Sequence, residues 1–353
     1  MPSSSATLIR TYPNTASGFA GTLQLRGGSA PTTVGGLTVV PVLVHEDSEF
    51  GAEVSGVDWS KPISDEIKDA LVKLQDKYAV LIFRQTGLDN ARHIAFSQQL
   101  GSKLEINPFY YGKENDRVKE DFLWDVGNIE LDNSLVKPDS RRWHHSLGNC
   151  LWHSDSTYHQ ERSKYSLLLS HGNPVQGGSW THFADTRQAY ADLPQEKKDQ
   201  LEDLIIEHDL WHSRKLGSPV VYSAPSAAER AKKPPAYHKL VQVGPDGRKT
   251  LYLAAHARLV LGMGLEESQK LIWELIDWCT QPRYVFSMEW RDGGDMVWWD
   301  NRQSMHRANP YTENMTARDV RRATVIDDGP LAWGVGEVER KATGWTPEAV
   351  HSE

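Results

Sequence analysis

The sequence predicts an α+β fold in which a jelly-roll core, a double-stranded β-helix, is buttressed by helices. Capped helical patterns gather early in the chain, whereas many short strand-like runs are spread over its last third. The chain shows no internal repeats, and its 353 residues, 39% of them hydrophobic, can bury a sizeable core. This distribution favours one domain, a double-sheet barrel with helices packed around it.

The first elements alternate between strand and helix. Residues 38–45, TVVPVLVH, are β-branched and predict a strand, after which Ser64 is suited to cap a helix over residues 65–77. Residues 78–84, YAVLIFR, form a short apolar run typical of a buried strand. Residues 89–100 then predict a second capped helix.

The middle of the chain continues this alternation and then breaks it. Strands are expected at residues 164–172 and 177–185, and helices at residues 186–194 and 195–210. Residues 213–236 contain four prolines among glycine, serine and alanine, which predicts a long loop. A lid and a disordered insertion are both open interpretations of that loop.

The last third resumes with apolar runs. Its expected elements are an apolar run at 250–257, a helix at 266–281, and strands near 284–290, 295–301 and 321–327. We expect one domain over residues 37–335, preceded by a flexible arm at 1–36 and followed by a tail at 336–353. The arm has two arginines and no acid, so a transit peptide is the alternative.

Composition narrows the class of function. A net charge of −8 and a pI near 6.0 argue against a nucleic-acid surface and favour small-molecule chemistry. Only two cysteines occur, which fits a reducing compartment. The sequence contains no run of about 18 apolar residues, the length that a membrane span needs. We therefore expect a cytoplasmic protein that binds neither nucleic acid nor membrane, and a homo-oligomer is left open.

The stretch GNCLWHSDSTYH places His153 and Asp155 two residues apart. On a strand, these side chains would share one face, and His306, which follows a strand-like aromatic run, supplies a third ligand. Two histidines and one carboxylate leave three positions of an octahedral ion open, as Fe(II) oxygenases require. The alternative is that all three are ordinary hydrogen-bonded polar residues, which is how we interpret the similar spacing at His45.

Several ordered blocks resemble the Fe(II)/2-oxoglutarate dioxygenases typified by taurine dioxygenase and 2,4-dichlorophenoxyacetate dioxygenase. They are FGAEVSGVDWSKPISDE, YAVLIFRQTGLDNARHIAFSQQLG, LWHSDSTY, GGSWTHFADTRQAY, WDNRQSMHRANPY and ARDVRRATV. The resemblance covers residues 38–330 and looks closer to the phenoxyacetate branch. It implies that His153, Asp155 and His306 are the iron ligands and that 2-oxoglutarate and O2 are co-substrates.

The resemblance also implies how the co-substrate is bound. It assigns the far carboxylate of 2-oxoglutarate to Arg318 and Thr181, although each match needs a one-residue insertion in this chain. A guanidinium fork can hold a carboxylate with two hydrogen bonds, and a hydroxyl can add a third.

The same comparison of motifs gives four substrate contacts. Arg322, four residues after Arg318, matches the position that contacts the acidic group of taurine. Asn107 stands where taurine dioxygenase has a histidine, which weakens a taurine assignment, and Tyr110 and Asn149 match pocket positions. Since a buried guanidinium needs an anion, we expect the substrate to carry an acid that pairs with Arg322.

The sequence therefore predicts an enzyme, an Fe(II)- and 2-oxoglutarate-dependent oxygenase that oxidises a C–H bond of a small acidic organic molecule. Succinate and CO2 are the expected co-products. Three alternatives are open: an amino-acid-tailoring oxygenase that desaturates or closes rings, a zinc hydrolase, and a jelly-roll binding module without catalysis.

Overall fold

A computed structural model describes most of the chain. The described residues are 30–45, 48–109, 112–172, 180–223, 225–291, 293–309 and 317–342. Most of the expected arm and tail lies outside these ranges. At the described end of the arm, β1 (Thr32–Val34) pairs antiparallel with β2 (Leu37–Val44), and the tail contains α10 (Glu337–Ala342).

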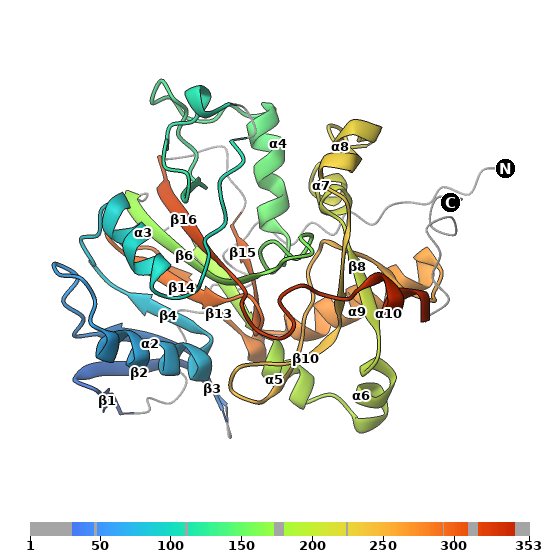
Figure 1. Ribbon diagram of the computed structural model, residues 1–353, viewed down its shortest axis with the longest axis horizontal. Coiled ribbons are helices and arrows are strands. Elements are labelled where there is room, and N and C mark those ends of the chain that lie inside the picture. The colour runs from blue at the N-terminus through green and yellow to red at the C-terminus, as the bar shows by residue number, and fades with distance from the viewer. Residues whose placement is uncertain are drawn as a thin grey trace.

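A large sheet dominates the mixed helix-and-sheet architecture (Figure 1). Eight strands are hydrogen-bonded in the order β1-β2-β3-β4-β14-β6-β16-β5. The strands not yet given are β3 (Glu49–Ser55), β4 (Val80–Phe83), β5 (Trp124–Asp125), β6 (Ser163–Gly172), β14 (Met296–Asp300) and β16 (Asp319–Ile326). The expectation of a fold that mixes helices with many strands is confirmed.

One face of the large sheet is covered by α2 (Asp65–Tyr78) and α3 (Asn90–Gln98). The side chain of Ser64 accepts a hydrogen bond from the N–H of Ile67, as the capping prediction requires. Leu71 of α2 and Phe96 of α3 pack with alternate residues of the strands, such as Leu81 of β4. The helices and the sheet thereby form one apolar layer.

The opposite face of the large sheet packs on a second sheet, of order β13-β7-β15. These strands are β13 (Val285–Glu289), β7 (Trp180–Asp185) and β15 (Ser304–Ala308). Phe183 of β7 stacks on Phe286 of β13 at 5.4 Å between ring centroids, and Trp299 of β14 faces them from the large sheet. His306 of β15 packs against Phe183 and Trp299 of this core.

A third layer completes the molecule. It holds the sheet β12-β8-β9, the hairpin β10-β11, and a second apolar core on helix α9 (Leu265–Cys279). The remaining strands are β8 (Ile205–His208), β9 (Ala236–Lys239), β10 (Val241–Val243), β11 (Lys249–Leu251) and β12 (Ala257–Val260). The remaining helices are α4 (Arg141–Leu147), α5 (Thr186–Ala191), α6 (Gln195–Leu201), α7 (Leu210–Gly217) and α8 (Ala227–Lys232), with 3-10 turns η1 (Lys113–Asn115), η2 (Gly148–Cys150) and η3 (Pro282–Tyr284).

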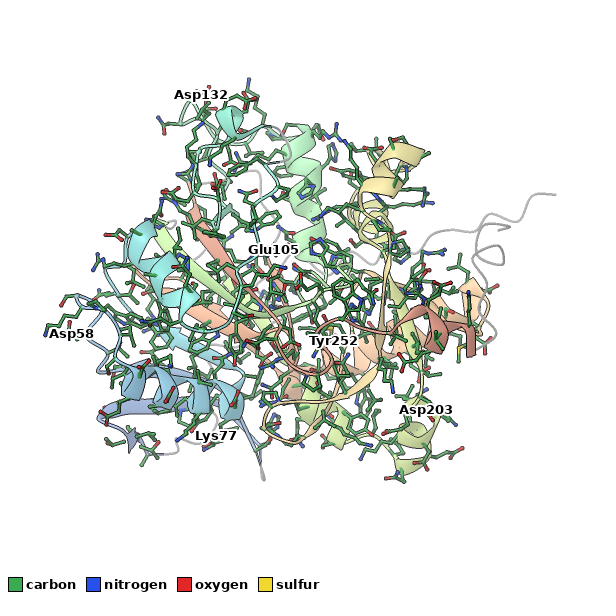
Figure 2. The ribbon with its side chains drawn as sticks, in the orientation of Figure 1. Asp58, Lys77, Glu105, Asp132, Asp203 and Tyr252 are labelled. Carbon is green, nitrogen blue, oxygen red and sulfur yellow. The ribbon has the colours of Figure 1, made fainter. Side chains whose placement is uncertain are left out.

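Figure 2 shows how side chains fill the space between these layers. Tyr252 and Glu105 lie among the interior side chains, whereas Asp58, Asp132 and Asp203 project at the periphery. None of the helices in the described ranges is long and apolar enough to cross a membrane.

Two expected elements differ from the structure. The helix expected over residues 195–210 ends with α6, and β8 follows, because the β-branched Ile205 and Ile206 are buried in pairing with β9. The long loop expected at residues 213–236 contains the end of α7 and all of α8. Ser226 and Glu229 form a reciprocal capping box that allows this short helix between prolines.

Candidate functional site

Two distant segments bring the candidate ligands together. His153 is not on a long strand: it forms an isolated bridge with His306 of β15, and Asp155 begins the turn that follows. Each histidine N–H donates to the other's carbonyl, at 2.9 Å from His153 and 2.7 Å from His306. This pairing fixes the two imidazoles side by side, with ring centroids 4.2 Å apart.

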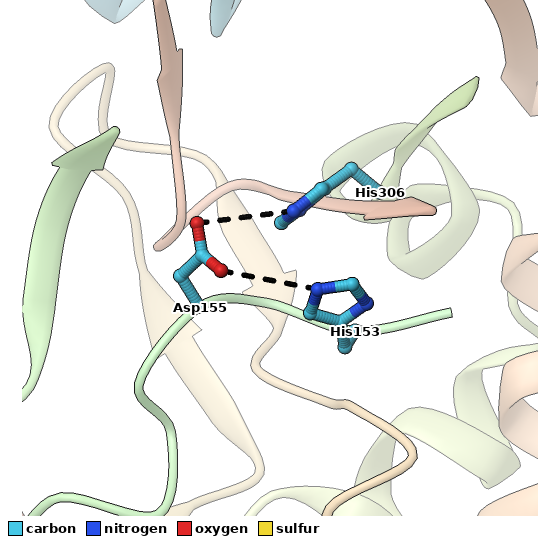
Figure 3. Close-up of side chains that lie close together, drawn as sticks. All are labelled: His153, Asp155 and His306. Carbon is cyan, nitrogen blue, oxygen red and sulfur yellow. Dashed lines mark ion pairs between the residues drawn. The ribbon is translucent and has the colours of Figure 1, made fainter. Parts of the chain in front are cut away.

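The three side chains converge on one point (Figure 3). The Nε2 atoms of His153 and His306 each lie 3.8 Å from an oxygen of Asp155, Oδ1 and Oδ2 respectively. One ligand atom from each residue lies within 4.8 Å of the other two, and all three side chains are buried. In the part of the chain that the structure describes, this is the single group of that kind.

Hydrogen bonds orient the ligand atoms. His153 Nδ1 lies 2.7 Å from the carbonyl of Leu151, so Nδ1 carries the proton and the Nε2 lone pair faces Asp155. Ser166 donates to Asp155 Oδ2 at 2.7 Å, and Asn301 accepts from the Asp155 N–H at 2.9 Å. These contacts hold the carboxylate and one imidazole in place before any ion binds.

The protonation states suit a divalent cation. Burial lowers the pKa of His153 and holds that of His306 well below the ordinary value, so both imidazoles are neutral near pH 7. Burial would raise the pKa of Asp155, but the Arg322 guanidinium and both histidines outweigh burial and lower that pKa to about 2. Two neutral imidazoles and one carboxylate are the donors that a facial Fe(II) site uses.

Arg322 is placed differently from the expectation. Its Nη1 lies 2.5 Å from Asp155 Oδ1, and the buried carboxyl of Glu105 adds a second negative charge nearby. The guanidinium therefore already has an anionic partner, and the argument that burial alone requires a substrate acid there is wrong. Arg322 does line both cavities beside the histidines, so contact with a ligand is retained as a proposal.

A small cavity of about 60 Å³ adjoins the histidines. Thr181 and Arg318 both line it, so the structure brings these two expected residues together. Thr181 Oγ1 accepts from the indole N–H of Trp290 at 3.0 Å, and the Arg318 guanidinium carbon lies 5.9 Å from the same ring. Trp290 was not anticipated from sequence, because its role depends on the pairing of β13 with β7.

A larger cavity of about 350 Å³ is lined by His153 and Asp155. Asn107 and Asn149 line it, as expected, whereas Tyr110 lies outside the described residues. The Asn107 amide donates to Leu123 O at 2.9 Å and accepts from the N–H of Phe109 at 3.0 Å. Its side chain therefore shapes the wall through backbone contacts.

Sequence reasoning missed other residues of this cavity. Arg214 of α7, His256, Tyr158 and Trp124 line it as well. His256 Nδ1 lies 3.1 Å from Thr157 Oγ1, and its ring is 5.8 Å from that of His153. A histidine directly after the apolar run LYLAA carries no local signal, since only the tertiary fold brings it to the site.

His45 plays no part in this site. Its ring packs 6.2 Å from that of Tyr284, and its N–H donates to Ser48 O at 2.8 Å. Its neighbour Asp47 lies outside the described residues. The interpretation of His45 as a packing residue agrees with these contacts.

Comparisons with known proteins agree with this geometry. The family model described as "Taurine catabolism dioxygenase TauD, TfdA family" matches residues 41–324. An α-ketoglutarate-dependent 2,4-dichlorophenoxyacetate dioxygenase of Cupriavidus pinatubonensis is 36% identical over 281 residues, 79% of this chain and 95% of the relative. An alkylsulfatase of Acinetobacter baylyi is 29% identical over 83% of this chain and 87% of its own length.

The solved structures show the same likeness. The crystal structure of AAD-2 in complex with Mn(II) and N-oxalylglycine has a TM-score of 0.73 and 34% identity, covering 83% of this chain and 98% of that one.

Proposed function

Because this chain belongs to the TauD/TfdA dioxygenase family, we propose that His153, Asp155 and His306 hold Fe(II) in an enzyme that depends on 2-oxoglutarate. The observation that carries the proposal is the buried group of three ligands, whose two Nε2 atoms face one ionised carboxylate. A cavity of about 60 Å³, lined by an arginine and a threonine, adjoins them. When bound, Fe(II) with 2-oxoglutarate and O2 supplies the oxidation of a substrate C–H bond, with release of succinate and CO2.

Arg318 and Thr181 are the proposed holders of the far carboxylate of 2-oxoglutarate. Trp290 supports this arrangement, because its N–H fixes the Thr181 hydroxyl and its ring lies beneath the guanidinium. The indole N–H donates to Thr181 Oγ1, so the hydroxyl hydrogen is directed elsewhere and can be donated to a carboxylate. Thr181 and Trp290 are buried, which strengthens the hydrogen bond between them.

The larger cavity is the proposed substrate site, with Asn107, Tyr110, Asn149 and Arg322 as contacts. Asp155 and His153 also line this cavity, which supports the proposal. Relatives are named for phenoxyacetate, phenoxypropionate and alkyl sulfate, which supports a small organic acid as substrate here. We further propose that the two facing sheets are the halves of a jelly roll, and that the free thiols Cys150 and Cys279 reflect a cytoplasmic location.

An anaerobic titration tests the proposal. Fe(II) and 2-oxoglutarate added to the protein should give a metal-to-ligand charge-transfer band in the visible, and added O2 should yield succinate. A zinc hydrolase or a binding module would give neither signal. The absence of both band and succinate, in protein shown to bind Fe(II), would contradict the proposal.

A further inference from the structure

Glu105 is a buried acid whose charge acts on Arg322, and Arg322 lines both cavities beside the metal ligands. We propose that Glu105 is a positioning residue that determines specificity: it offsets the charge of Arg322 and so limits how strongly the larger cavity prefers an anionic substrate to a neutral one. This inference rests on the proposed function, because it concerns the substrate of the same site.

Backbone contacts fix Glu105 beside β16, the strand that carries Arg322. The N–H of Glu105 donates to the carbonyl of Thr324 at 2.9 Å, and Leu104 forms an isolated bridge with Val325. Glu105 lies among the interior side chains in Figure 2, and 8% of the residue is exposed. Its main chain is therefore tied to the same strand as Arg322, two residues further along.

Side-chain contacts fix the carboxylate as well. Ser156 Oγ donates to Glu105 Oε2 at 3.1 Å, and His159 Nδ1 lies 3.3 Å from Oε1. His159 Nε2 accepts from the ammonium of Lys233 at 3.0 Å, so Nδ1, the nitrogen near Glu105, carries the ring proton. Both carboxylate oxygens thus lie near a hydrogen-bond donor, which favours the ionised form of Glu105.

The charges of Glu105 and Arg322 act on each other. Arg322 Nη1 lies 2.5 Å from Asp155 Oδ1. Burial would lower the pKa of Arg322, but the carboxylates of Asp155 and Glu105 raise it above its ordinary value. Burial raises the pKa of Glu105, and the positive charge of Arg322 acts in the opposite direction. One guanidinium is therefore shared by two carboxylates before any substrate arrives.

A substrate anion at Arg322 would be a third negative charge near this guanidinium. Glu105 repels such an anion, and between buried groups the repulsion is screened much less than it is at the surface. A neutral analogue of the same shape does not experience this repulsion. Glu105 therefore reduces the preference for acids that Arg322 would otherwise give, because repulsion sets specificity as much as attraction does.

Binding to the loaded protein tests this through the direction of the effect. Protein saturated with Mn(II) and N-oxalylglycine is titrated calorimetrically with phenoxyacetate and phenylmethanesulfonate, and with neutral phenoxyacetamide. Glu105→Gln keeps the size of the side chain and an oxygen that can accept from Ser156, but removes the charge. At least one anion should then bind at least about threefold more tightly than it binds to the native protein, while the affinity for the amide changes less than twofold. A purely structural defect would instead weaken all three ligands.

Three further variants separate charge from position. Glu161→Gln removes the same charge from a side chain that is 38% exposed and pairs with Lys103, and should leave every affinity within twofold. Ser156→Ala removes the hydrogen bond to Glu105 but keeps the charge, and should not tighten the anion. Glu105→Asp keeps the charge on a shorter side chain, and should tighten the anion less than Glu105→Gln does.

Three results would overturn the inference: no anion binding in either native protein or Glu105→Gln, a ratio of anion to amide affinity that rises by less than about threefold in Glu105→Gln, or an equal rise in Glu161→Gln or Ser156→Ala. If circular dichroism shows that Glu105→Gln does not fold, Glu105→Asp decides, and no tightening of the anion there would overturn the inference.

These results are independent of the proposed function, which is judged by the charge-transfer band and succinate. A native enzyme with both signals, whose preference for the anion is unchanged in Glu105→Gln, would contradict only the inference about Glu105.

Discussion

At the scale of single residues, the metal site depends on which atoms are left to face its centre. The proton on His153 Nδ1 is held by Leu151 O, and Asp155 is fixed by Ser166 and Asn301, so the ligand atoms are oriented in advance. A nearby polar residue whose atoms are not oriented in this way should therefore not take over the role of a lost ligand.

Replacing His153, Asp155 or His306 by alanine should each abolish 2-oxoglutarate turnover at saturating Fe(II), because two ligands cannot retain the ion. The fold should persist, as judged by circular dichroism. His45→Ala is the matched control and should remain active. An active His306→Ala with an inactive His45→Ala would refute the assignment.

Arg318→Ala should raise the KM for 2-oxoglutarate strongly, because losing one partner of a buried charge pair costs about 2 to 5 kcal/mol. Arg321→Ala is the control, since Arg321 pairs with Asp319 and Asn90 and does not line the small cavity. Steady-state kinetics with 2-oxoglutarate as the varied substrate measures both. A KM within twofold of the native value in Arg318→Ala would place the anchor elsewhere.

At the scale of elements, a buried histidine joins α3 to the large sheet. His93 Nε2 lies 3.1 Å from the carbonyl of Leu167 on β6, and burial lowers the pKa of His93 to about 3. The unfolded chain binds a proton at His93 near pH 6.5, whereas the folded chain does not. The contribution of this group to the free energy of unfolding is therefore fully present above pH 6.5 and is lost as the pH falls toward 3.

This single group should lower the free energy of unfolding by about 1.4 kcal/mol for each pH unit below 6.5. Other buried histidines add to the total, so the comparison is with His93→Gln, measured by denaturant unfolding between pH 7 and pH 4.5. The stability difference between native and variant should shrink toward low pH. A difference that stays constant over this range would contradict the neutral, buried His93.

The contact between α7 and η2 is also testable. A Cβ at Gly217 would stand 2.9 Å from the backbone nitrogen of Gly148, so Gly217→Ala forces the two elements apart. We expect a loss of about 1 to 3 kcal/mol in unfolding free energy. Gly172→Ala, where no heavy atom lies within 4 Å, is the control and should be nearly neutral.

Local patterns predicted the elements unequally. Ser64 and the run at 78–84 carried clear signals, and α2 and β4 appear where they were expected. Residues 195–210 carried no such clear signal, because the period of a short apolar segment does not distinguish a strand from a helix. Pairing of β8 with β9 and β12 decides its conformation, and pairing is invisible in one segment.

At the scale of the whole molecule, ligands should stabilise the fold. Mn(II) with N-oxalylglycine at a hundred times its Kd should add about 2.7 kcal/mol to the unfolding free energy. For a chain of this size that corresponds to a rise in Tm of several degrees in a thermal-shift assay. His306→Ala should show no rise, and a rise of equal size there would mean that the ligand binds elsewhere.

The residues of the site could be predicted only in part, because tertiary packing brings some of them together. His153 and Asp155 form a local motif, and several ordered blocks of resemblance placed His306, Thr181 and Arg318. Arg214 and Trp290 belong to no motif near the ligands, and only the packing of α7 and β13 brings them to the cavities. The electrostatic partner of Arg322 was likewise set by tertiary contact.

The isolated bridge between His153 and His306 has a consequence for assembly. It joins segments about 150 residues apart, and closing a loop of that length costs about 4 kcal/mol in chain entropy. Neither segment alone offers all three ligands, because His153 and Asp155 come from one and His306 from the other. We therefore expect the three ligands to bind one ion together only in a chain whose distant segments have already paired.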